Sequence, residues 1–241
     1  MQNDTLDVRL PGSAVLLFTW AAGAVDALTY LSSHVFTANM TGNTVLLGLS
    51  LGKASGADAL RSSAALLGYI VGVAWGALLP YESANARSRR AFLLRAAVAE
   101  ASLLAVFAAL WPLSSSRPEE PAVAALLIGI SGVAMGLQSA LVTRFKVPGV
   151  VTTYITGTIT SMVSGVTNHL RGRREPTPSG DAPQARMKLQ AQVFVIYGVA
   201  ALASGALYSR WHAAAGLLPI LAILLAAALA LRRKQGLAVR D

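Results

Sequence analysis

The stretch from Phe36 to Thr44 carries polar side chains whose types and spacing suit the binding of a small polar molecule. It holds two asparagines, three threonines and a glycine, yet it lies between the apolar runs 13–31 and 45–51. A weaker copy, rich in threonine, occupies residues 151–159. Polar groups in an apolar setting cost free energy unless they find hydrogen-bond partners. The recurrence of the pattern therefore indicates a structural or functional reason for it.

In the first copy we expect a half-helix that begins at about Thr41 and ends at about Leu51, inside the membrane. The unpaired backbone N–H groups at the start of a helix, together with its dipole, favour an anion or a polar substrate. The second copy would offer equivalent groups. The alternative is that these groups bond to neighbouring backbone and only build the fold. The candidate substrate-binding residues of the two copies are Asn39, Thr41, Gly42, Asn43, Thr153, Thr156, Gly157 and Thr158.

Two acidic side chains fall inside apolar segments, where a carboxylate is rare and usually functional. Asp26 lies about two-thirds along the first segment. We interpret it as a substrate-binding group and a proton or cation carrier, or else as an anchor that accepts N–H bonds from the loop Asn39–Asn43. Glu100 lies midway along a later segment. It is either a second relay group or the partner of a basic residue in the bundle.

The other polar residues form no recognisable catalytic or metal-binding motif. The chain has no cysteine, which excludes disulfides and thiolate chemistry. No cluster of histidine and acidic residues has metal-ligand spacing, and nucleophile elbows, phosphate loops and paired catalytic acids are missing. We therefore expect no metal, no cofactor and no enzymatic activity.

The composition indicates an integral membrane protein. Of the 241 residues, 54% are hydrophobic and 13% are charged, whereas a soluble domain has about 45–50% apolar and about 25% charged residues. Since about 20 residues cross a bilayer core as a helix, six segments are long enough. The predicted fold is all-α, a single membrane domain over residues 1–241. The six segments are 13–31, 62–80, 91–111, 121–142, 189–209 and 213–231.

The distribution of basic residues favours six spans over eight. The net charge of +9 would also suit a nucleic-acid-binding protein, but the basic residues stand in short loops and form no extended face. Six spans with both termini in the cytoplasm put 16 of the 20 Lys and Arg residues on the cytoplasmic side. If segments 36–52 and 150–167 also crossed, the best division would be 13 against 7. By the positive-inside rule, the two polar segments enter the membrane and return on the same side.

The two polar segments belong to a weak internal repeat. Thr41-Gly42 aligns with Thr156-Gly157 at an offset of 115. Asp26 stands opposite Gln138 at an offset of 112, which adds Gln138 to the candidate substrate-binding residues. The shared order of these features is better support for a repeat than any single match.

Each half of the repeat, about residues 13–111 and 121–231, would hold three spans. An odd number of spans inverts the second half relative to the first. Inverted repeats are typical of secondary transporters, which bind substrate near the midplane at interrupted helices. The loop at about residues 168–188 would be a flexible cytoplasmic connection.

Gly68, Gly72 and Gly76 recur every four residues and form one face of a predicted helix. Small residues at this spacing allow another helix to approach closely. The contact would lie either within one chain or between two copies in a homodimer.

Several of these motifs resemble the YoaK-type bacterial inner-membrane proteins. The resemblance covers nearly the whole chain, and the string Ala38-Asn-Met-Thr-Gly-Asn43 is its most specific part. It implies a multi-pass protein of the bacterial inner membrane in a family of unknown function, and it supplies no substrate. The matching strings are Gly23-Ala-Val-Asp-Ala-Leu-Thr-Tyr-Leu31, Phe36-Thr-Ala-Asn-Met-Thr-Gly-Asn43, Gly136-Leu-Gln138 and Thr153-Tyr-Ile-Thr-Gly157.

These observations favour a transporter or channel for a small solute, anions included, with a midplane site formed by the two Thr-Gly segments. One alternative is a membrane-embedded enzyme acting on a lipid or a quinone, which would need Asp26 and Glu100 to converge on one cavity. Another is a structural or regulatory membrane partner, in which Asn39 and Asn43 would tolerate alanine unless folding failed.

Overall fold

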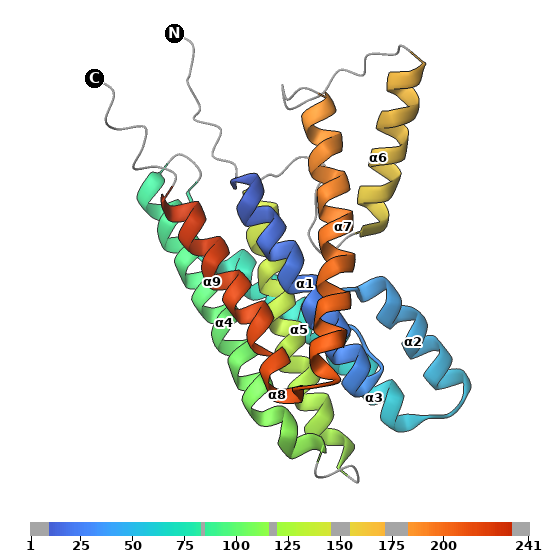
Figure 1. Cartoon of the computed structure of the whole chain (residues 1–241). Coiled ribbons are helices and arrows are strands. Elements are labelled where there is room, and N and C mark those ends of the chain that lie inside the picture. The colour runs from blue at the N-terminus through green and yellow to red at the C-terminus, as the bar shows by residue number, and fades with distance from the viewer. Residues whose placement is uncertain (1–9, 83–84, 116–119, 146–154, 172–182, 233–241) are drawn as a thin grey trace.

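The computed structural model describes residues 10–82, 85–115, 120–145, 155–171 and 183–232. Within these ranges the regular elements are all helices, and no strand is present (Figure 1). Long apolar runs become helices because a helix satisfies its backbone hydrogen bonds within its own segment, as lipid surroundings require. The helices are α1 (Gly12–Ser33), α2 (Met40–Gly52), α3 (Gly56–Leu78), α4 (Ala86–Ser115), α5 (Pro121–Arg144), α6 (Ile155–Leu170), α7 (Pro183–Tyr208), α8 (His212–Ala215) and α9 (Leu217–Arg232).

In the described part of the chain, five helices are long and apolar enough to cross a membrane, namely α1, α3, α4, α5 and α7. The predicted all-α membrane fold is confirmed at this level, but the sixth predicted segment differs. It is divided at Gly216 into the single turn α8 and α9, an apolar helix of 16 residues. Pro219 lies in the first turn of α9. That position tolerates proline because its N–H would have no partner within the helix, whereas an uninterrupted helix would lose a hydrogen bond there.

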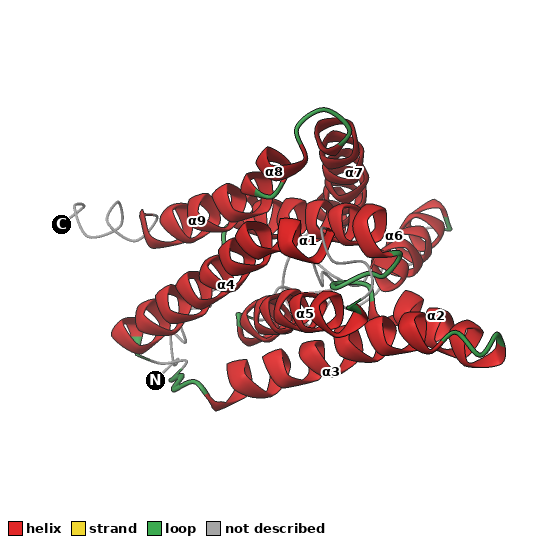
Figure 2. Ribbon diagram, turned by 90° about the horizontal axis from the view of Figure 1, so that it is seen from below, coloured by secondary structure: helices red, strands yellow, loops and turns green. Residues whose placement is uncertain are grey.

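The half-helices α2 and α6 do not run the length of the bundle. α2 has 13 residues, begins at mid-height beside α1 and reaches the end of the bundle at which α3 begins (Figure 1). α6 reaches the opposite end, at which α7 begins (Figure 1). Both lie on the same side of the bundle, as the view from below confirms (Figure 2).

Helix α5 lies at the centre of the bundle, between α3 on one side and α1 and α4 on the other (Figure 2). α3 packs along α5, α7 packs along α1, and α9 contacts both α1 and α4. The outer faces of α3 and α7 expose large apolar side chains, among them Leu78 and Leu202. This is the character of a surface that faces lipid rather than water.

The glycine face of α3 contacts a helix of the same chain. A Cβ added at Gly68 or Gly72 would collide with the backbone carbonyl of α5 at Gly129 or Val133. The close approach that small residues allow is therefore used within one chain. Of the two contacts that the sequence left open, the structure shows the one within the chain, and a homodimer stays a prediction.

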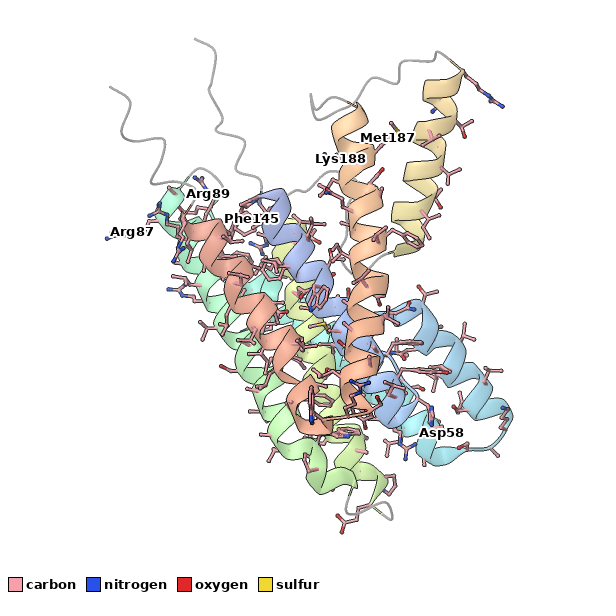
Figure 3. The ribbon with its side chains drawn as sticks, in the orientation of Figure 1. Asp58, Arg87, Arg89, Phe145, Met187 and Lys188 are labelled. Carbon is pink, nitrogen blue, oxygen red and sulfur yellow. The ribbon has the colours of Figure 1, made fainter. Side chains whose placement is uncertain are left out.

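Charged residues mark the two ends of the bundle. Arg87, Arg89 and Lys188 lie at one end together with Phe145, the residue after α5, while Asp58 lies at the other end (Figure 3). At the first end, the guanidinium of Arg144 lies over the ring of Tyr81, 5.4 Å from the ring centroid. A cation over an aromatic face is stabilising, so this contact joins the ends of α3 and α5.

Candidate functional site

The candidate site begins at the loop that joins α1 to α2. His34 follows α1 with a φ of 58°, a left-handed conformation that turns the chain back alongside the helix. The backbone N–H groups of Thr37 and Ala38 then donate to Asp26 Oδ1 at 2.8 and 2.7 Å. The N–H of Asn39 is 3.4 Å from the same oxygen. Since Asp26 is only 3% exposed, its carboxylate anchors the loop deep in the bundle.

The second oxygen of Asp26, Oδ2, accepts a hydrogen bond from the hydroxyl of Tyr197 on α7. All the described hydrogen bonds to Asp26 thus come from donors. An ionised carboxylate is an acceptor only, so this environment suits the anion. The structure shows Asp26 as an anchor, but its loop donors are Thr37, Ala38 and Asn39 and not the predicted stretch Asn39–Asn43. The role of Asp26 as a proton or cation carrier stays a prediction.

Asn43 and Asn39 hold the loop and the start of α2 in shape. The Asn43 side chain accepts the backbone N–H of Phe36 at 2.9 Å and donates to the carbonyl of the same residue. Asn39 caps α2 by accepting the N–H of Gly42 at 3.2 Å. Gly42 lies against the ring of Phe36, whose nearest carbon would be 2.9 Å from an added Cβ. These groups bond to neighbouring backbone, the structural alternative that the sequence left open, and their part in binding a solute stays a prediction.

Thr41 stands apart from the other candidates of the first copy. Its side chain is exposed, and nothing in the described ranges of the chain forms a hydrogen bond with its hydroxyl. It lies in the first turn of α2, where backbone N–H groups have no partner within the helix. Thr41 is therefore the candidate whose substitution would disturb the fold least.

Gln138 lies away from the loop. Its Nε2 donates to the carbonyl of Phe18 at 3.1 Å, and its side chain is buried between α5 and α1. The residue of α5 that does meet the loop is Ser131, whose Oγ is 3.0 Å from Oγ1 of Thr37. Sequence reasoning missed this pair because the two residues lie in separate segments, and nothing in either segment reports which helices are neighbours.

The second copy of the motif is described only in part. Thr153 lies outside the described residues. Thr156, Gly157 and Thr158 lie in the first turn of α6, where Gly157 is half-buried and the two threonine side chains are outside the description. That turn is at the mid-height end of α6 (Figure 1).

Glu100 is fully buried in the middle of α4. Neither of its carboxylate oxygens forms a hydrogen bond or an ion pair with any described residue. The same face of α4 buries Phe92, Ala96 and Leu104. The basic partner that the sequence offered as one reading of Glu100 is therefore missing from the described part of the bundle.

A close helix crossing joins α1 to α7 next to Asp26. A Cβ added at Gly23 would collide with the backbone carbonyl oxygen of Tyr197, so the two backbones approach in a way that only glycine permits. The same tyrosine donates its hydroxyl to Asp26, three residues after Gly23. The glycine and the carboxylate thus lie one helical turn apart on the same face of α1.

A matching crossing joins α5 to α3. A Cβ added at Gly136 would collide with the backbone carbonyl oxygen of Tyr69. The hydroxyl of Tyr69 lies 2.7 Å from Oγ of Ser139, three residues after the glycine. Ser139 thus has the place in this crossing that Asp26 has in the other, and it follows Gln138, the residue that the sequence alignment set opposite Asp26, by one position. A tyrosine inside each partner segment, Tyr69 and Tyr197, was the signal that sequence reasoning overlooked.

Comparison with known proteins decides the family. A family described as "Protein of unknown function (DUF1275)" matches residues 14–231. The chain belongs to the DUF1275 family. The "UPF0700 transmembrane protein YoaK" of Bacillus subtilis (strain 168) is 37% identical over 155 residues, which are 64% of this chain and 66% of that protein. The chain thus matches just under two thirds of the length of this relative.

The resemblance carried by the Ala-Asn-Met-Thr-Gly-Asn string is therefore confirmed. No solved structure matches the chain. Membership of the DUF1275 family, together with the five long apolar helices of the described residues, makes this a multi-pass integral membrane protein. The family description assigns no activity, so function has to be argued from the site.

Proposed function

We propose that this protein is a transporter or channel for a small polar solute, anions included, built from two inverted repeats whose Thr-Gly segments form a site at the midplane. The observation that carries the proposal is the pair of matching crossings. Gly23 lies against Tyr197, and Gly136 lies against Tyr69. Each crossing joins the first helix of one half to the third helix of the other, as a two-fold axis in the membrane plane requires.

The helix contacts support the same symmetry. Helices α1, α2, α3 and α4 correspond in order to α5, α6, α7 and α9. If the two sets are exchanged, the α3–α5 contact becomes the α7–α1 contact, and the α4–α5 contact becomes the α9–α1 contact. In the same way the α2–α3 contact becomes the α6–α7 contact. All six contacts are observed. Corresponding helices run in opposite directions through the bundle (Figure 1). Secondary transporters of inverted topology bind their substrates at such an axis.

The depth of the first loop supports a midplane site. Ser131 is near the middle of α5, and it contacts Thr37 at the tip of the loop. α2 therefore begins at the mid-height of the bundle, beside α1, with the positive end of its dipole at this depth. Thr41 adds an exposed hydroxyl to that turn. A polar or anionic solute is the natural ligand of such an N-terminus.

We also propose that the protein lies in the bacterial inner membrane with both termini in the cytoplasm, since the end that carries Arg87, Arg89 and Lys188 is the basic one (Figure 3). The chain has no cysteine, so single cysteines are clean probes. Asp58→Cys should react with a membrane-impermeant maleimide in intact cells, and Arg87→Cys should react only after permeabilisation. Labelling of both from the same side would refute this topology.

Uptake into proteoliposomes across a panel of small anions and metabolites tests the function. Thr41→Ala should reduce uptake, or the stabilisation of purified protein by a bound solute, and should leave the melting temperature of the solute-free protein unchanged. Thr44→Ala is the matched control, because Thr44 lies on the same half-helix and the bond described for its hydroxyl goes to the Met40 carbonyl. No flux and no stabilisation with a folded protein would count against the proposal.

The competing enzyme hypothesis finds no comparable support. Asp26 lies at the contact of α1 with α7, and Glu100 lies on α4, which packs against α5 and α9. No described hydrogen bond links the two carboxyl groups.

A further inference from the structure

Glu100 is a buried acid for which the described part of the fold supplies no hydrogen-bonding group. Its side chain is 0% exposed, and both carboxylate oxygens lack a hydrogen-bond partner among the described residues. It lies in the candidate span Ala86–Pro112, roughly 20 Å along the helix axis from either end. Water at the ends of the bundle is therefore far from this carboxyl group.

The helices packed against α4 bring no charge to Glu100. α4 packs against α5 and α9 and touches α8 briefly. The titratable side chain of α5 is Arg144 and that of α9 is Arg232, each at the C-terminal end of its helix, and α8 carries His212 at its start. On α4 itself the nearest basic residue, Arg95, is exposed. The buried residues of α9 are apolar, namely Pro219, Ala222, Ile223, Ala226 and Ala227.

An ionised carboxylate in these surroundings would be costly, because an unpaired buried charge loses its hydration without compensation. A metal cation would not relieve the cost, since it requires several oxygen ligands and no group of three potential ligands lies together among the described residues. A proton requires only the one oxygen that Glu100 itself supplies. The described arrangement therefore fits the neutral carboxylic acid.

We propose that Glu100 is a proton-binding site and that the proton is the coupling ion of this protein, an inference that rests on the transport function proposed above. In the described state the side chain is the acid. Release breaks its O–H bond, passes the proton to water and leaves the carboxylate, so α4 must first separate from α5 or α9 far enough to admit water. Proton loss and a rearrangement of α4 are thus one coupled event.

Infrared spectroscopy of the purified full chain tests the protonation state directly. The wild type should show a carboxylic acid C=O band that shifts in deuterium oxide and is lost in Glu100→Gln. The band should still be present in the wild-type protein at neutral pH, where a glutamate in water, with a pKa of about 4.3, is ionised. Isotope labelling of the glutamate carboxyl groups assigns the band in the wild type, should the variant fail to fold. An ionised Glu100 at neutral pH would overturn the proposal.

A second measurement uses the reactivity of the acid. A lipid-soluble carbodiimide adds to protonated carboxyl groups, and mass spectrometry should find the adduct on Glu100 and not on Asp26, whose oxygens accept hydrogen bonds. An adduct on Asp26 with an unmodified Glu100 would contradict the inference.

Flux measurements distinguish the proposed transport function from the proposed proton coupling. A protonated Glu100 without any flux refutes the transport function alone, and flux that is unchanged by Glu100→Gln and by a pH gradient refutes the coupling alone.

Discussion

The crossing of α1 with α7 and the crossing of α5 with α3 share one backbone contact and differ in one side chain. In both, a glycine lies against the carbonyl of a tyrosine, and the tyrosine hydroxyl bonds to the residue three positions after the glycine. That residue is Asp26 in the first crossing and Ser139 in the second. The close approach of the helices is therefore common to both halves, and the carboxylate is particular to the first.

The difference has a physical reason. Besides the tyrosine, Asp26 accepts the N–H groups of the loop that precedes α2, whereas the bond described for the Ser139 hydroxyl is the one with Tyr69. A carboxylate has enough lone pairs for several donors at once, and a serine hydroxyl does not. The carboxylate at Asp26 is thus explained by the loop that it anchors.

The largest effect should follow removal of the anchor. Asp26→Ala leaves two buried N–H groups, the part-buried N–H of Asn39 and a tyrosine hydroxyl without their acceptor, and it should lower the free energy of unfolding by about 3–5 kcal/mol. Ser139→Ala should cost only about 1 kcal/mol. Unfolding by sodium dodecyl sulfate in mixed micelles measures both. Equal losses at the two positions would remove the distinction between the crossings.

The shared backbone contact predicts an intermediate effect that is alike in both halves. Gly23→Ala and Gly136→Ala force a Cβ against a carbonyl oxygen and should each destabilise the protein by about 1–3 kcal/mol. Gly198→Ala on α7 is the matched control, because a Cβ there would meet nothing within 4 Å. It should change the stability by less than about 0.5 kcal/mol. If Gly23→Ala lowered the stability and Gly136→Ala left it unchanged, the proposed correspondence between the two crossings would be refuted.

The two tyrosines sharpen the comparison further. Tyr197→Phe removes a hydrogen bond to a carboxylate and should cost about 1.5–3 kcal/mol, while Tyr69→Phe removes one to a hydroxyl and should cost about 0.5–1.5 kcal/mol. Combining Tyr197→Phe with Asp26→Ala should cost less than the sum of the single changes, since the partners interact directly. Additivity in this double-mutant cycle would mean that the hydroxyl does not stabilise the carboxylate.

The smallest effect concerns the cap of α2. Asn39→Ala removes the acceptor for the Gly42 N–H and should lower the stability by about 1 kcal/mol. Asn39→Ser should restore most of the loss, because serine caps helices about as well as asparagine. A loss of solute uptake in Asn39→Ser at unchanged stability would instead assign the amide to the solute site.

Much of the architecture could be predicted from the sequence because lipid imposes simple rules on composition. The long apolar segments become α1, α3, α4, α5 and α7, and the motif 36–44 becomes a loop and the start of a half-helix. The last predicted segment, 213–231, differs in detail. A new helix, α9, begins shortly before Pro219, whereas hydropathy predicted one continuous span. The predicted repeat stays a prediction, and its alignment set Gln138 opposite Asp26, whereas the residue that bonds to a crossing tyrosine in the same way is Ser139.

Roles within the site could not be predicted, because polar residues of the same type met different neighbours. Asp26 and Glu100 look alike in sequence, as single acids in apolar segments. One proved to have four donors around it, and the other has no partner among the described residues. The glycine face of α3 likewise could not reveal that its partner was α5.

The sequence by itself determined that this chain is a multi-pass helical membrane protein of the DUF1275 family with a polar segment that interrupts its apolar spans. Composition and periodicity suffice for that, since each segment responds separately to the lipid around it. The tertiary structure alone decided which helices cross at Gly23 and Gly136, and which buried acid is anchored. Those outcomes depend on contacts between residues far apart in the chain, and such contacts leave no periodic signal in either segment.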